Sequence, residues 1–135
     1  MQDNKKNIIV DLTFQFALDV IELCELLEAN KKFVLAKQLL RAGISIGANV
    51  REAQNAESKA DFIHKMKIAA KEADEAQYLL LLCKSVKSYP SSEKLAASVL
   101  SIHKVLSKII GSSKLNSSYQ VSEPVSDYQI TESSN

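Results

Sequence analysis

Apolar side chains recur at steps of four and three residues along most of this chain, and this periodicity constrains the fold more than any other feature. Between residues 59 and 88, positions 62, 66, 69, 73, 76, 80, 83 and 87 follow that spacing, and only the last of them, Lys87, is polar. Such a seam is typical of a helix packed along its length against other helices. With 3 Gly and 2 Pro in 135 residues, the chain also lacks the turn residues of a β-sandwich or doubly wound fold. The sequence therefore predicts an all-α fold.

Four helices with short connections are predicted, over residues 9–29, 33–53, 59–88 and 92–110. Ser58 and Asp61 have the spacing of a capping box at the third start, Pro90 separates the last two helices, and Gly111 is a fitting stop. Helices of these lengths form an up-down-up-down antiparallel four-helix bundle. We expect a bundle domain over residues 1–111. Residues 112–135, in which eight of twenty-four are Ser, are expected to form a disordered tail.

Two features of the predicted helices indicate close packing and assembly. Gly43 and Gly47 lie one turn apart in the second helix, where glycine is unfavourable unless another helix approaches closely. The run Tyr78 to Cys83 in the third helix is apolar on all sides, and a small monomer cannot bury both faces of such a helix. The sequence therefore predicts a tight helix crossing and a homo-oligomer.

Charge is divided unevenly along the chain, although the net charge is only +1. Residues 8–30 hold five acids and no base, whereas residues 31–71 hold nine bases and three acids, a net charge of +6. One interpretation is that neighbouring helices, in the same chain or in a partner chain, pair these charges. The other is that the basic segment is an electrostatic footprint for nucleic acid.

The sequence contains no complete catalytic or metal-binding motif. His64 follows Asp61 by three residues, which is half of one Glu-x-x-His-type pair of a di-metal bundle, but His103 has Leu100 at the matching position. Cys24 and Cys83 lie within apolar helical patterns and suit reduced core thiols of a cytoplasmic protein. No Gly-rich phosphate loop, signal-type start or membrane-length apolar run is evident. We expect no catalytic residue, cofactor, metal or membrane, and thus not an enzyme.

A narrow polar stripe distinguishes the second predicted helix. Its five members fall within an arc of about 80° and are Gln38, Arg41, Ser45, Asn49 and Glu52. The third helix supplies complementary groups near its middle, namely Lys71, Glu72 and Glu75. Because an arginine fork can bind a carboxylate at two points, we expect a hydrogen-bonded network between the two helices that fixes register or a subunit contact. The alternative is an ordinary solvated face.

This stripe carries a resemblance to a known family. The run from Gln38 to Ala53, with Asp61-Phe62-Ile63 and the later Lys71-Glu72-Ala73 and Glu75, resembles the bacterial "four helix bundle protein" family, whose founding members are encoded in intervening sequences of 23S ribosomal RNA genes. Many relatives have Gly where this chain has Ala53. The resemblance covers about residues 8–111. It implies a four-helix bundle in a ring-shaped homo-oligomer, a homopentamer, and kinship with the accessory protein of diversity-generating retroelements. It gives the polar stripe a structural role and no catalytic one.

Two hypotheses for function follow. The first is a non-enzymatic oligomeric scaffold that binds structured RNA or DNA through bases outside the polar network, with Lys37, Arg51, Lys59, Lys65 and Lys67 as candidate contacts. The second is a protein-interaction ring whose basic side docks an acidic partner, such as another protein encoded by the same genetic element. Competition by free nucleic acid distinguishes the two.

Overall fold

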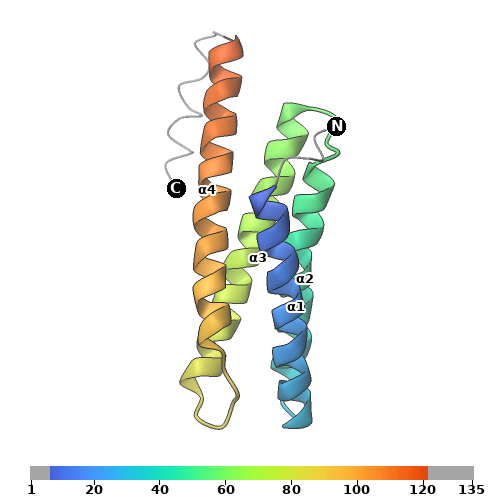
Figure 1. Cartoon of the computed structure of the whole chain (residues 1–135), viewed down its shortest axis with the longest axis vertical. Helices are drawn as coiled ribbons and strands as arrows, with labels where there is room; N and C mark the ends of the chain where they lie inside the picture. Colours follow the sequence, from blue (N-terminus) through green and yellow to red (C-terminus); the bar gives the residue numbers. More distant parts are fainter. Residues whose placement is uncertain (1–6, 122–135) are drawn as a thin grey trace.

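The computed structural model describes residues 7–121, and this part of the chain is all-α with no strand. Its helices are α1 (Ile8–Ala29), α2 (Phe33–Ala53), α3 (Lys59–Ser85) and α4 (Glu93–Val121). Successive helices run in opposite directions, so that the α1–α2 turn and the α3–α4 loop lie at the same end of the bundle (Figure 1). The ammonium of Lys32 lies 5.0 Å from the ring centre of Tyr89 and joins these two connections. The predicted helical-bundle architecture of the single chain is confirmed.

The four helices surround one core. Each helix contacts its two neighbours around the bundle, most extensively at α1–α2 and α2–α3 and least at α1–α4. The predicted seam of α3 is buried from Met66 to Cys83. The largest fully buried side chains come from all four helices and include Phe16, Leu27, Leu39, Ile46, Met66, Leu95, Ile102 and Leu106.

The first three helix starts and the first two helix ends lie within one residue of their predicted positions. Ser58 caps α3 by accepting a hydrogen bond of 3.0 Å from the Asp61 amide. The Asp61 carboxylate accepts from the Glu57 amide at 3.3 Å, so the second bond of the predicted capping box reaches one residue further back. Helix α3 ends at Ser85, not Ser88, because Val86 adopts an extended conformation.

The end of α4 differs from the prediction. Ser92 caps the helix by accepting a hydrogen bond from the Leu95 amide at 3.1 Å. The helix then continues through Gly111 to Val121, ten residues beyond the expected stop, and α4 extends past the other helices (Figure 1). A glycine stops a helix only when it leaves the helical conformation, and Gly111 does not. The predicted tail therefore does not begin at residue 112. Its remaining part, residues 122–135, lies outside the described residues.

Helix α4 also meets, over Glu93–Leu115, the length and composition of a membrane-crossing helix. This is weak evidence, because helices of bundle cores meet the same criterion. In the bundle, α4 buries a single stripe made of Leu95, Val99, Ile102 and Leu106.

The close approach of α1 and α2 is the tight crossing that the glycines indicated. A Cβ atom at Gly43 would lie 2.8 Å from Cγ1 of Val20, closer than real Cβ contacts allow. A Cβ atom at Gly47 would lie 3.4 Å from the carbonyl oxygen of Thr13. Val20 and Thr13 are both fully buried, so neither can turn into solvent to make room. The prediction of a tight crossing is confirmed, with α1 as the partner of α2.

This geometry predicts opposite effects for two Gly→Ala substitutions. Gly43→Ala adds a methyl group against a stiff, buried valine, and overpacking of this kind costs about 1–3 kcal/mol. Gly111→Ala adds the same group in open space within a helix and should stabilise by about 1 kcal/mol. Denaturant unfolding of both variants at one protein concentration checks this. A gain in stability for Gly43→Ala equal to that for Gly111→Ala would contradict the close approach.

Candidate functional site

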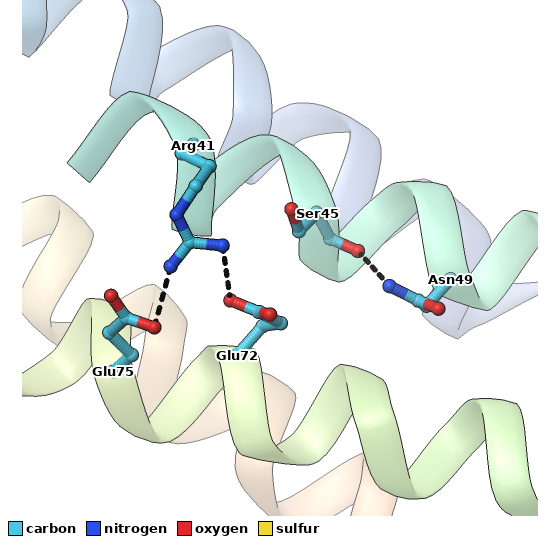
Figure 2. A network of polar contacts seen from close by, with 5 residues as sticks. All are labelled: Arg41, Ser45, Asn49, Glu72 and Glu75. Atoms are coloured by element: carbon cyan, nitrogen blue, oxygen red, sulfur yellow. Dashed lines mark hydrogen bonds and ion pairs between the residues drawn. The ribbon is translucent and has the colours of Figure 1, made fainter. Parts of the chain in front are cut away.

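Arg41 of α2 bridges two carboxylates of α3 at the surface of the bundle (Figure 2). Its Nη2 lies 2.6 Å from Oε1 of Glu75 and its Nη1 lies 3.3 Å from Oε1 of Glu72. The two glutamates are one turn apart, so both project toward α2. Arg41 therefore contacts Glu72 and Glu75, the two carboxylates that the sequence predicted as its partners.

The Arg41 bridge is exposed rather than buried. The arginine side chain is 52% exposed, against 40% for Glu75 and 19% for Glu72. The hydrogen bond from Arg41 to Glu75, together with the charges of both glutamates, raises the pKa of the guanidinium. Exposed ion pairs contribute little to stability. Removal of Arg41 would therefore leave two carboxylates that water still reaches, and a large loss of stability is not expected.

The rest of the polar stripe forms separate local contacts. Asn49 donates through Nδ2 to the backbone oxygen of Ser45 at 2.9 Å, a bond within α2 (Figure 2). Gln38 and Lys71 are exposed and make no hydrogen bond or ion pair with another described residue. Of the residues assigned to the predicted network, Arg41, Glu72 and Glu75 contact one another across the two helices, whereas Gln38 and Lys71 lie outside it.

A second contact between α2 and α3 involves Glu52. Its Oε1 accepts from the ammonium of Lys65 at 2.8 Å, and this hydrogen bond raises the pKa of Lys65. Glu52 and Arg41 are eleven residues apart, about 16 Å along the helix. The two ion pairs form together in one register of α2 against α3.

The five candidate nucleic-acid contacts do not form one group. Lys65 is engaged by Glu52, so its assignment outside the polar network is wrong. The other four are exposed and make no ion pair with a described residue. Lys59 and Lys67 belong to α3, whereas Lys37 and Arg51 belong to α2.

The acidic residues of α1 are not neutralised by the basic residues of α2 and α3. Within the described part of the chain, the one α1 acid with an ion pair is Asp19, which lies 3.4 Å from the ammonium of Lys94 on α4. Glu22, Glu25 and Glu28 are exposed and make no such pair. Pairing between these helices of one chain, one form of the first charge interpretation, is therefore not observed. Pairing with a partner chain remains open.

The two histidines occupy different environments. His64 is exposed, whereas Nε2 of His103 is buried 3.1 Å from Oδ1 of Asp74, without hydrogen-bond geometry. Among the described residues, no group of three or more His, Cys, Asp or Glu side chains could hold a metal ion. The Asp74–His103 approach joins residues far apart in the sequence, and no local pattern indicated it.

The chain is similar to known proteins in both sequence and structure. A family model described as 23S rRNA-intervening sequence protein matches residues 5–111. The chain belongs to this family. It is also 41% identical to a protein of unknown function from the S23 ribosomal protein family of Bacteroides thetaiotaomicron, with a TM-score of 0.68 over 76% of this chain and 97% of that one. No curated protein matches the chain. The resemblance of the helix-two motif to the intervening-sequence family is thus confirmed.

The exposed Arg41 bridge predicts a small, salt-sensitive effect on stability. Arg41→Ala should lower the denaturation midpoint slightly more than Lys67→Ala, which removes an exposed base without an ion pair. The difference should disappear at about 1 M salt, where surface charges are screened. A large loss at both salt concentrations would show that Arg41 is buried in the working state of the protein.

Cys24 should behave as an inert core thiol. Its Sγ donates to the backbone oxygen of Ala36 at 3.3 Å, and burial raises the pKa of the thiol to about 11. At neutral pH only about one thiol in ten thousand is then ionised, and the thiolate is the reactive form. Labelling by a disulfide reagent should follow the rate of global unfolding. Rapid labelling of the folded protein would contradict the buried position.

Proposed function

We propose that this member of the 23S rRNA-intervening sequence protein family is a non-enzymatic, cytoplasmic scaffold that self-associates and binds structured RNA or DNA. The observation that supports nucleic-acid binding best is the set of unpaired lysines that remains on α3 once its ion pairs with α2 are formed. Arg41 engages Glu72 and Glu75, and Lys65 engages Glu52. Lys84 lies 3.5 Å from Glu93 of α4. The other bases of α3, namely Lys59, Lys67 and Lys71, have no ion-pair partner among the described residues.

These bases form a short cationic segment of the α3 surface. Lys59, Lys67 and Lys71 are exposed, and the segment spans twelve residues, about 18 Å of helix. A helix segment of that length can lie alongside several phosphates of a duplex. Phe62, the aromatic residue between these lysines, packs against the core. The contacts would therefore be to the phosphate backbone and would carry little base specificity.

Self-association is supported by apolar surface that the single chain leaves uncovered. The predicted all-round apolar face of α3 leaves Tyr78 and Leu81 exposed, and Leu100 of α4 lies exposed beside a hollow of about 180 Å³ between the two helices. Assembly of several copies, in the ring or homopentamer that the resemblance implies, would cover such surface and repeat the α3 lysines. Repetition multiplies a weak individual contact through avidity.

Binding of a labelled RNA hairpin and a labelled DNA duplex at about 50 and 200 mM salt tests the proposal. Three phosphate contacts alone predict about a fortyfold loss of affinity over that range. The triple variant Lys59→Ala, Lys67→Ala, Lys71→Ala should reduce the slope of log affinity against log salt by about three.

The matched control removes three other exposed lysines, as Lys87→Ala, Lys104→Ala, Lys108→Ala, with the same change in net charge. Equal losses in both triple variants would mean that α3 has no special role. No binding at the lower salt would contradict nucleic-acid recognition and favour the alternative, a ring that docks an acidic protein. The mass of the same sample reports self-association independently.

A further inference from the structure

Two matching lines of exposed residues run along α1 and α2. On α1, Asp11, Leu18 and Glu25 recur every seven residues. On α2, the exposed residues Lys37, Ile44 and Arg51 have the same spacing. We call these two sets the α1 line and the α2 line. Seven residues are nearly two turns, so each line follows one side of its helix with about 10 Å between members. One line reads acid, apolar, acid, and the other reads base, apolar, base.

Neither line is satisfied within the single chain. None of the four charged residues makes an ion pair or a side-chain hydrogen bond with another described residue. Leu18 is 42% exposed and Ile44 is 43% exposed. Phe14 and Ile21 widen the apolar part of the α1 surface, since both are exposed one turn from Leu18. Uncovered apolar side chains between unpaired charges are typical of an interaction surface.

The α1–α2 crossing places the two lines at equal heights along the bundle. Thr13 lies against Gly47, and Val20 lies against Gly43. By continuation along these antiparallel helices, Leu18 lies within about one turn of the level of Ile44. The same continuation gives Glu25 the level of Lys37 and Asp11 the level of Arg51.

We infer that α1 of one copy docks on α2 of the next copy, through the α1 line and the α2 line. A rotation axis parallel to the helices keeps every residue at its own level. Glu25 then meets Lys37 of the next copy, and Leu18 meets Ile44. Asp11 meets Arg51 at the other end, so each unpaired charge receives an opposite one.

The charges also exclude the opposite arrangement. A two-fold axis across the helices would place α1 against a reversed α1 and bring Asp11 toward Glu25 of the other copy. Like charges at both ends oppose that contact, and charge patterns of this kind determine orientation more than affinity. The affinity would come from the apolar residues between them.

A contact between two different surfaces of the same chain closes into a ring when its rotation permits. The inference rests on the self-association in the proposed function and names one surface that mediates it, distinct from the apolar surface of α3 and α4 described there. It also separates the candidate bases by role, because Lys37 and Arg51 then bind a neighbouring copy. The α3 lysines remain available to phosphates.

Charge reversal and recovery test this contact through the mass of the full-length protein over a dilution series. Glu25→Lys alone and Lys37→Glu alone should each raise the concentration of half-dissociation by at least about tenfold. The double variant, in which each copy carries both changes, should return to within about threefold of the original value. Glu57→Lys, the same change at an exposed acid outside the two lines, should have no effect.

The apolar centre is tested separately by Leu18→Asp, which should leave only monomer. Its control is Leu115→Asp on α4, a more exposed leucine outside the surface. Unchanged helicity by circular dichroism confirms that each variant folds. An assembled wild-type protein whose mass is insensitive to Leu18→Asp and Glu25→Lys overturns this surface but not self-association. A wild-type protein that is monomeric at every concentration overturns both, and a double variant that fails to recover overturns the pairing.

Discussion

The close approach of α1 and α2 at Gly43 is the constraint on which the rest of this structure depends. The space that a side chain would occupy there is filled by Val20, a buried residue with little rotational freedom. This packing fixes how far α1 can slide along α2. It thereby sets the relative heights of the surface residues on both helices and aligns the α1 line with the α2 line.

The polar contacts between α2 and α3 have a different role. The Arg41 bridge and the Lys65–Glu52 pair lie at the surface, where ion pairs add little stability. They match a single register of the two helices, and they neutralise acids that would otherwise offset the α3 lysines. The family motif therefore determines the net charge that this face presents as well as its geometry.

Helix positions could be predicted from the sequence because burial imposes a period on the residues themselves. The α3 seam and the cap at Ser58 are both local patterns, and both are present. The end of α4 could not be predicted, since Gly111 is equally compatible with a helix stop and with a helix interior in open space. The local pattern does not distinguish these cases.

The site was only partly predictable for a related reason. The positions of Glu72 and Glu75 near the middle of the third helix predicted them as partners of Arg41. The pairing of Lys65 with Glu52 was not predictable, because it depends on the register of two helices. Exposure is also a property of the assembled bundle. The sequence pattern identified the polar stripe without indicating that Arg41 lies half in solvent.

The docking that we propose brings the α1 surface of one copy against the α2 surface of the next copy, at equal height along the bundle. Membership in the 23S rRNA-intervening sequence protein family and a structural relative of unknown function leave that contact undefined. Disulfide cross-linking between two singly substituted proteins, Leu18→Cys and Ile44→Cys, tests it most directly, because the native thiols Cys24 and Cys83 are buried. A covalent dimer is expected in the oxidised mixture and none in either variant alone. A cross-link in Leu18→Cys alone, or none in the mixture, would contradict it.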